Sequence, residues 1–473
     1  MSIGGGWWAR RGVLLLALAL ATMALQAQAA ELLTDAQKAE IDKIAQQIIE
    51  KSGVPSASLA VVKDGKLAYA KAYGKARLDP SLEATPAMPY AIGSISKQFT
   101  ASLIMMLQEQ RKLSLDDKVG KWLRNLTQAN EITIRQLLSM TSGYQDFWPQ
   151  DYVMPMMLKS TTADAILKGW AQIPLDFEPG TKWQYSNTNY VIAGLIVEKA
   201  SGKPLYELLQ EKVLHPLGMT SAWNVDAKPM GAGDPLGYIR YALGPLRPAP
   251  EEGAGWMFAA GELAMTPSDL AKWDISLMNE SLLKPSSYLA LETETVLNNG
   301  LGTRYGLGMF VTSVKNHRVL EHGGEVSGFT AENIVLPDDK FAVIVTTNQD
   351  AVAASGDIGR QVMNAYLNSL NVGDPNQDAL MRKVFDGLRE GKIDRSLFTD
   401  NANFYFSEQA LEDYQSSLTP LGEVESFRQT SNSLRGGMTH MLYEVKLKEK
   451  TVDINIYQMP DGKLEQFLIS AAN

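Results

Sequence analysis

Hydrophobic positions recur with two different periods along the first hundred residues. Ile41, Ile44 and Ile48 follow Thr34-Asp35 at helical spacing, which predicts an amphipathic helix capped by one of these two residues. The stretches 56–62 and 66–73 instead alternate apolar and polar residues around Asp64-Gly65, which is typical of a β-hairpin. A second helical stripe follows at positions 95, 99, 103, 104 and 107, so we expect a core-packed helix that begins at or just before Ser94.

The pattern then changes from helix to strand near Gly300. Apolar stripes at helical spacing occupy 134–140, 190–200, 205–213 and 267–277. After Gly300, strand patterns occupy 305–312, 318–321, 332–336 and 341–347, and a closing helix is predicted at 357–370. This order predicts an α+β fold for residues 30–371, in which both ends of the segment build an antiparallel sheet and an all-helical subdomain is inserted between them.

A second, smaller domain is predicted at the C-terminus. Turn-forming residues at 372–377 predict a linker, and 378–389 has a helical pattern. Strands are predicted at 403–407, 424–430, 438–447, 451–458 and 463–469. The order of elements in 378–473 resembles cystatin-like or NTF2-like α+β folds. We expect an accessory or dimerising role for this domain rather than a second catalytic site.

The first 29 residues have the pattern of a cleaved signal peptide. Arg10-Arg11 precede an apolar run, and Ala27-Gln-Ala29 forms an Ala-x-Ala cleavage site. We therefore expect a periplasmic or secreted protein with no membrane span after cleavage. An uncleaved anchor is the alternative, and the sequence leaves the export route, Sec or twin-arginine, undecided.

Composition excludes several classes of function. The 473 residues carry a net charge of −9 and no run of Lys and Arg long enough for a basic patch, which argues against a nucleic-acid partner. With no Cys, four His and no His-Glu-x-x-His motif, a zinc hydrolase lacks its usual ligands, and no cofactor is expected. No Gly-x-Ser-x-Gly nucleophile elbow occurs either. The oligomeric state is left open.

Ser94-Ile-Ser-Lys97 is the first candidate for chemistry. Residues three apart on a helix share a face, so the Lys97 amine can lie within hydrogen-bonding reach of the Ser94 hydroxyl. Unpaired N–H groups at the helix N-terminus could meet a developing oxyanion. Ser281-Leu-Leu-Lys284 matches the same pattern, but Pro285 disfavours helix at Lys284.

Two later stretches supply further polar residues as candidates for the same site. Tyr185 and Asn187 alternate on a predicted loop before the helix at 190–200, so both can face one cleft. His322-Gly323-Gly324 ends a predicted strand, where two glycines allow a close backbone approach to a ligand.

Together these stretches make the chain resemble the superfamily of serine β-lactamases and penicillin-binding proteins, within a class C-like branch that includes esterases and D-amino-acid peptidases. The resemblance covers roughly residues 35–370. Its matching stretches are Ile92–Thr100, Ile134–Tyr144, Glu178–Tyr190, Pro216–Met219 and His322–Gly324 with Gly328-Phe329.

The resemblance implies a role for each matching residue. Ser94 would be the acyl-accepting nucleophile, with Lys97 and Tyr185 as the base pair and Asn187 as a polar contact. The sequence does not decide whether Lys97 or Tyr185 takes the proton. His322, Gly323, Gly324 and Glu325 would face the substrate, and the backbone N–H groups of Ser94 and Glu325 would form the oxyanion hole.

The resemblance has one departure, at the third motif. β-Lactamases and transpeptidases usually carry Lys-Thr/Ser-Gly there, whereas His322-Gly323 offers at most a titratable cation and no hydroxyl. We therefore expect a serine hydrolase that cleaves small esters or D-amino-acid and peptide-type amides, with a small-molecule or peptide-like substrate. The alternatives are a β-lactamase or penicillin-sensitive DD-carboxypeptidase, and a non-catalytic binding protein.

Overall fold

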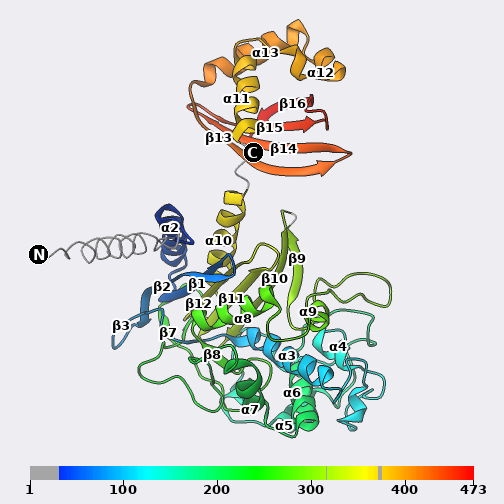
Figure 1. Ribbon diagram of the computed structural model, residues 1–473. Helices are drawn as coiled ribbons and strands as arrows, with labels where there is room; N and C mark the ends of the chain where they lie inside the picture. Colours follow the sequence, from blue (N-terminus) through cyan, green and yellow to red (C-terminus); the bar gives the residue numbers. More distant parts are fainter. Residues whose placement is uncertain (1–30, 316, 371–374, 473) are drawn as a thin grey trace, which may run out of the picture. The chain divides into compact units, whose positions relative to one another are not determined.

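A seven-stranded sheet is assembled from two distant parts of the chain (Figure 1). The computed structural model describes residues 31–315, 317–370 and 375–472. In order across the sheet, the strands are β3 (Leu82–Glu83), β2 (Lys66–Arg77), β1 (Ser56–Lys63), β12 (Phe341–Thr347), β11 (Phe329–Leu336), β10 (His317–Val326) and β9 (Phe310–Val314). The pairings from β3 through β10 are antiparallel. The predicted fold class is confirmed.

The junction between the two parts lies at β1 and β12. These strands pair from Ala57 opposite Thr347 to Val62 opposite Ala342. Both are buried along almost their whole length, as expected when both faces of a sheet are covered. Helix α2 (Asp35–Ser52) packs against β1 and β2, and α8 (Pro267–Asn279) packs against β1, β2 and β12.

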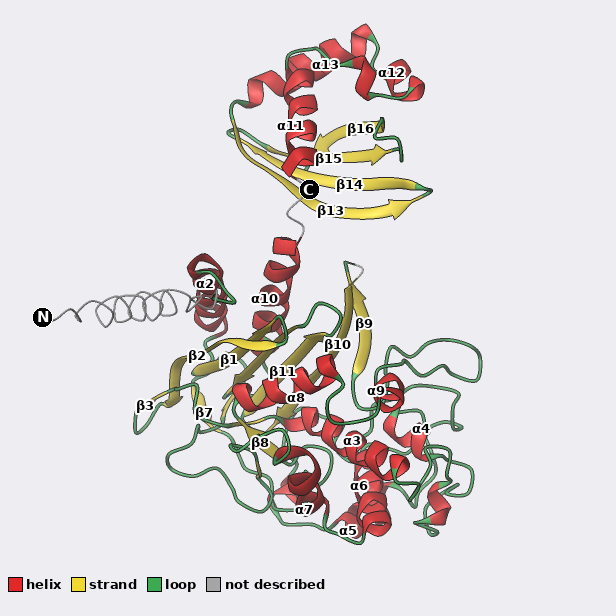
Figure 2. Ribbon diagram, in the orientation of Figure 1, coloured by secondary structure: helices red, strands yellow, loops and turns green. Residues whose placement is uncertain are grey.

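The segment between β3 and β9 is mostly helix and loop (Figure 2). Besides α8, its longer helices are α3 (Ser96–Glu109), α5 (Ala163–Trp170) and α6 (Asn187–Ser201), with shorter helices α4 (Ile134–Leu138), α7 (Leu205–Leu209) and α9 (Pro285–Leu291). Helix α6 packs against α3, α4, α5 and α7. Short strands β4 (Tyr90–Ala91), β8 (Leu263–Met265) and β5 (Trp223–Asn224) form a separate sheet, and β6 (Tyr238–Arg240) pairs with β7 (Leu246–Pro248).

The chain divides into two compact units. Residues up to Thr312 with His317–Gly359 form the larger unit, and Ser313–Asn316 with Arg360–Asn473 form the smaller one, so the division falls within α10 (Ala354–Leu370). The expected signal peptide, 1–29, lies outside the described residues. No helix of the described residues is both long and apolar enough to cross a membrane.

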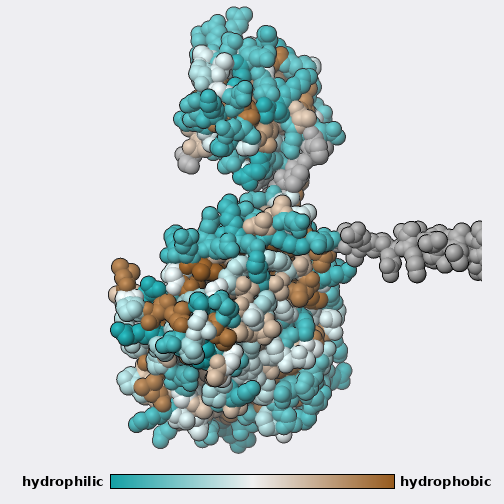
Figure 3. All heavy atoms as spheres, turned by 90° about the vertical axis from the view of Figure 1, so that its left-hand side faces the viewer, coloured by the Kyte–Doolittle hydropathy of each residue, from teal (hydrophilic) through white to brown (hydrophobic). Residues whose placement is uncertain are grey.

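The smaller unit combines helices with a four-stranded antiparallel sheet. Its helices are α11 (Pro375–Arg389), α12 (Asp400–Tyr405) and α13 (Glu408–Leu418), and its strands follow sequence order: β13 (Val424–Arg435), β14 (Met438–Leu447), β15 (Thr451–Gln458) and β16 (Leu464–Ala471). They enclose a separate core that includes Phe385, Tyr443 and Phe467. On the face drawn in Figure 3, this unit is mostly hydrophilic, whereas apolar patches mark the larger unit.

Two sequence-based predictions in the smaller unit are wrong. Residues 372–374 of the predicted linker lie outside the described residues, but 375–377 belong to α11, which begins at Pro375. Proline suits the first turn of a helix, where no backbone N–H is needed. The strand predicted at 403–407 overlaps α12, whose N-cap Thr399 accepts a hydrogen bond from the Ala402 backbone N–H. The run of three aromatic residues from Phe404 to Phe406 does not mark a buried strand, since Phe404 is 89% exposed.

Candidate active site

Ser94 lies in a single 3-10 turn, Gly93–Ile95, that leads directly into α3. It therefore precedes the α-helix instead of occupying its first turn, and Lys97 is the second residue of α3.

This turn packs closely against β10 because glycines occupy both surfaces. Gly93 has a φ of +48°, and an added Cβ there would lie 2.7 Å from the Glu325 backbone nitrogen. A Cβ on Gly324 would lie 1.9 Å from the Ile92 carbonyl oxygen and 3.4 Å from the Ser94 backbone nitrogen. Larger residues would force the turn and the strand apart, so the two glycines bring the backbones of Ser94 and Glu325 together.

The Lys97 amine is fully buried and has three oxygen neighbours. Its Nζ lies 2.8 Å from each of Ser94 Oγ, Asn187 Oδ1 and the Ala260 carbonyl oxygen. Burial lowers the pKa of Lys97 to about 7, and the charge of Asp146 acts in the opposite direction. A substantial share of Lys97 is therefore neutral near pH 7.

This set of neighbours fixes where the lone pair of a neutral Lys97 points. The Asn187 and Ala260 oxygens are carbonyl oxygens and can only accept hydrogen bonds. The two remaining N–H groups of Lys97 are used on them, so the lone pair faces the third neighbour, the Ser94 hydroxyl. The arrangement can accept a proton from Ser94.

Asp146 holds Asn187 in the orientation that Lys97 requires. The Asn187 backbone N–H donates to Asp146 Oδ1 at 2.9 Å, and its Nδ2 lies 3.2 and 3.3 Å from the two carboxylate oxygens. An amide nitrogen cannot accept, so the carboxylate turns the amide oxygen of Asn187 toward Lys97. Sequence reasoning missed Asp146, although it follows the matched stretch Ile134–Tyr144 by only two positions.

Tyr185 lies beside the Lys97 amine. The Lys97 Nζ is 5.0 Å from the centre of the Tyr185 ring. Burial raises the pKa of Tyr185, while hydrogen bonding to Ser94 acts weakly in the opposite direction. Tyr185 is therefore a protonated phenol near neutral pH, and of the two candidate bases only Lys97 has a pKa near 7.

His322 is enclosed behind the site. It is 2% exposed; its Nδ1 lies 2.6 Å from the Gly323 carbonyl oxygen and its Nε2 lies 3.0 Å from the Tyr305 hydroxyl. A carbonyl oxygen can only accept, so Nδ1 carries the proton and the Tyr305 hydroxyl donates to Nε2. Burial, aided by the charge of Lys97, lowers the pKa of His322 to about 3. The cation that the sequence allowed at this position is therefore absent near pH 7.

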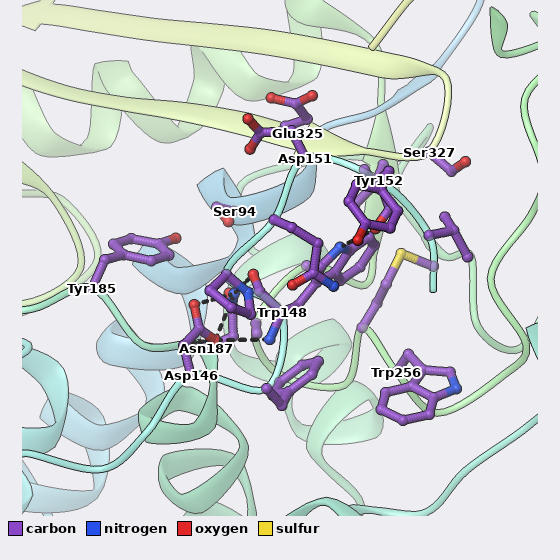
Figure 4. Close-up of a pocket in the computed structure, with 18 of the residues that line it drawn as sticks. Ser94, Asp146, Trp148, Asp151, Tyr152, Tyr185, Asn187, Trp256, Glu325 and Ser327 are labelled. Carbon is purple, nitrogen blue, oxygen red and sulfur yellow. Dashed lines mark hydrogen bonds between the residues drawn. The ribbon is translucent and has the colours of Figure 1, made fainter. Parts of the chain in front are cut away.

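A cavity of about 370 Å³ opens over Ser94 (Figure 4). Of the predicted site residues, Ser94, Tyr185, Asn187 and Glu325 line it, while Lys97, His322, Gly323 and Gly324 do not. His322 and Gly324 lie on the buried side of β10, so their expected contact with substrate is not observed.

Apart from Gln184, the remaining lining residues come from segments that sequence reasoning did not single out. About half of them belong to 146–153, a loop rich in aromatic and acidic residues, and others come from 256–261, 326–327 and Asp350. The mixture of Phe147, Trp148, Asp151 and Tyr152 in one short loop was the available clue.

Comparison with known proteins shows which family the chain resembles. The beta-lactamase family model matches residues 41–367. Protein flp of Staphylococcus aureus (strain N315) is 28% identical over 328 residues, which are 67% of this chain and 64% of that protein. A D-aminopeptidase of Brucella anthropi is 26% identical over 319 residues, 66% of this chain and 59% of the relative. The chain thus spans less than two thirds of the length of both relatives.

Among solved structures, the octameric penicillin-binding protein homologue from Pyrococcus abyssi is similar over 93% of this chain and 97% of that chain, with a TM-score of 0.62. At 21% identity, this likeness concerns the fold alone. The family model, in contrast, spans well over half of the chain and includes Ser94, Lys97, Tyr185 and His322. On these grounds the chain belongs to the beta-lactamase family, whose members include serine hydrolases.

Proposed function

We propose that this protein is an exported serine hydrolase that cleaves small esters or D-amino-acid and peptide-type amides through an acyl-enzyme on Ser94. The observation that carries the proposal is the position of Lys97, whose amine is buried, has a pKa lowered to about 7 and lies 2.8 Å from Ser94 Oγ. A serine hydroxyl is a weak nucleophile without such a base.

In the first half of the reaction, Ser94 Oγ attacks the substrate carbonyl carbon while its proton moves to Lys97 Nζ. The carbonyl π-electrons move to oxygen, and we assign the backbone N–H groups of Ser94 and Glu325 to this oxyanion. Collapse of the intermediate breaks the bond to the leaving alcohol or amine. That group takes a proton from Lys97, directly or through the Tyr185 phenol, and leaves an ester on Ser94.

In the second half, water attacks the acyl-enzyme. A water proton passes to Lys97, the second tetrahedral intermediate collapses, and Ser94 Oγ regains a proton as the carboxylic acid departs. Asn187 and Asp146 keep the Lys97 amine oriented toward the reacting oxygen throughout. They are positioning residues, because neither needs to exchange a proton with the substrate.

The substrate class draws on two further observations. The similar Brucella protein is named a D-aminopeptidase. In this chain, the position where β-lactamases usually carry a lysine holds His322, which is neutral and enclosed.

Covalent labelling tests the proposal. A fluorophosphonate probe followed by peptide mass spectrometry is expected to modify Ser94, and Ser94→Ala is expected to lose both the label and turnover of p-nitrophenyl esters. Ser281→Ala is the matched control, because Ser281 and Lys284 share the spacing but Lys284 has an extended backbone before α9. Absence of an adduct on Ser94, or turnover retained in Ser94→Ala, would overturn the proposal.

Export is part of the same proposal and rests on the pattern of residues 1–29. Expression of the full chain in a bacterium, followed by fractionation and N-terminal sequencing, is expected to yield a periplasmic or secreted protein that begins at Ala30. A cytoplasmic protein with an intact Met1 would contradict it.

A further inference from the structure

The wall of the cavity carries carboxylates and no basic side chain. Asp146, Asp151, Glu325 and Asp350 line it, and none of the described lining residues is Lys, Arg or His. Asp146 is committed to Asn187, which leaves three carboxylates facing the space above Ser94. An anionic substrate group would meet repulsion here, and a cationic group would meet attraction.

The three carboxylates come from distant segments. Asp151 belongs to the loop 146–153, Glu325 lies on β10, and Asp350 follows β12. Glu325 Oε1 accepts from the Ala351 backbone N–H at 2.8 Å, next to Asp350 in sequence. Burial raises the pKa of Glu325, and the charges of Asp151 and Asp350 raise it further, as expected for neighbouring carboxylates. Figure 4 shows Asp151 and Glu325 side by side.

Asp350 supplies an independent observation. It is only 5% exposed, and its Oδ2 accepts from the Gly328 backbone N–H at 3.0 Å. Its Oδ1 is buried and has no hydrogen-bond partner within the part of the chain that the structure describes. A buried carboxylate oxygen without a donor is costly, and a donor supplied by a ligand in the adjacent cavity would remove that cost.

Aromatic side chains accompany the carboxylates. Trp148 and Tyr152 line the same cavity, and Tyr152 is 59% exposed (Figure 4). Aromatic faces attract cations, so these rings suit the same kind of group as the carboxylates do.

We propose that Asp151, Glu325 and Asp350 form a subsite for an ammonium group carried close to the scissile carbonyl of the substrate. The proposal rests on the proposed function, since Glu325 also supplies a backbone N–H to the oxyanion and so places its side chain near the reacting carbon. The protein would then prefer substrates whose acyl part carries an ammonium group near the scissile carbonyl, and would disfavour substrates with a carboxylate in that place.

A series of three p-nitroanilides tests the subsite in the full-length protein. D-Phenylalanine p-nitroanilide carries the ammonium group, the 3-phenylpropanoyl compound lacks it, and the benzylmalonyl compound has a carboxylate in its place. We expect kcat/KM for the ammonium compound to exceed that for the neutral one by about tenfold or more, and the carboxylate compound to be the poorest.

Charge reversal at the exposed Asp151 provides the decisive variant, because no folding contact of its side chain is lost among the described residues. Asp151→Lys is expected to lower the ammonium-to-carboxylate ratio of kcat/KM by about a hundredfold, and Asp350→Asn to lower the ammonium-to-neutral ratio by about tenfold. Glu412→Lys, the same charge change on exposed α13 of the smaller unit, is the control and should leave both ratios unchanged.

Similar kcat/KM values for the three compounds, or ratios unchanged in Asp151→Lys, would overturn the subsite. If Ser94 is still labelled by the fluorophosphonate probe in that case, only the subsite fails. If Ser94 is not labelled at all, the proposed function itself fails.

Discussion

Lys97 and His322 are two basic side chains buried in the same unit, and burial lowers the pKa of both. They differ in what their nitrogens contact. Lys97 has two acceptors that use its N–H groups and a hydroxyl that faces its lone pair, whereas the lone pair of His322 is already occupied by the Tyr305 hydroxyl. Burial thus sets the protonation state of each, but hydrogen-bonding geometry decides which one can act as a base on Ser94.

Replacing Lys97 tests this contrast most strongly. In Lys97→Met, Ser94 loses the one neighbour among the described residues that combines an available lone pair with a pKa near 7. We expect kcat to fall roughly 10³–10⁴-fold, the usual effect of losing a general base. This decrease in kcat can be measured in stopped assays of p-nitrophenyl ester hydrolysis. Lys43→Met, at an exposed position of α2, is the control. A loss of less than tenfold would show that Lys97 is not the base.

Weakening the hydrogen bonds that orient the Lys97 amine should lower kcat by less than replacing Lys97 does. In Asp146→Asn, the carboxylate that orients the Asn187 amide becomes an amide, so the Lys97 lone pair is less firmly directed at Ser94. We expect kcat to fall about tenfold, as is typical of misplacing a catalytic group without removing it.

The pH profile of the same variant separates orientation from folding. Burial lowers the pKa of Lys97 and the charge of Asp146 partly offsets this effect, so neutralising Asp146 should move the acid limb of kcat/KM to lower pH. Activity is lost as pH falls because protonated Lys97 has no lone pair. An acid limb that stays in place or moves to higher pH would contradict the effect assigned to the charge of Asp146 on the pKa of Lys97.

For His322, the other buried base in the comparison, we expect Tyr305→Phe to affect stability more than catalysis. The variant removes the hydroxyl that donates to the buried His322 Nε2 and leaves that nitrogen unpaired. We expect a loss of about 1–3 kcal/mol in the free energy of unfolding, measured by urea denaturation, with only a few-fold change in kcat. Tyr152→Phe, at an exposed ring, should change stability by less than about 0.5 kcal/mol. A larger effect on kcat than on stability would give His322 a direct part in the reaction.

The smallest expected effect is that of His322→Gln on the acid limb of the pH profile of kcat/KM. His322 is uncharged above pH 4, since its pKa is lowered to about 3, so its replacement removes no charge near Lys97. The limb near pH 7 in kcat/KM should not move. If His322 were a cation, its removal would raise the pKa of Lys97 and shift the limb to higher pH.

Local sequence patterns were sufficient to predict many of the helices and strands of the larger unit. The helix before the first strand, the hairpin around Asp64-Gly65 and the strands β11 and β12 follow from period and turn residues within a few positions of one another. The same reasoning misjudged 403–407, where a run of aromatic residues favoured a strand but Thr399 caps a helix. The aromatic run was misleading because Phe406 is buried whereas Phe404 is exposed to solvent.

The sequence by itself determined that Ser94 and Lys97 share one side of a helix start, since their spacing of three is a property of helix geometry. Only the tertiary structure decided the chemistry of the pair. Asn187 is ninety positions from Lys97 and reaches it only through packing of α6 against α3. The protonation states of Lys97 and His322 likewise depend on burial, which is the sum of contacts from distant segments and is not written in any one motif.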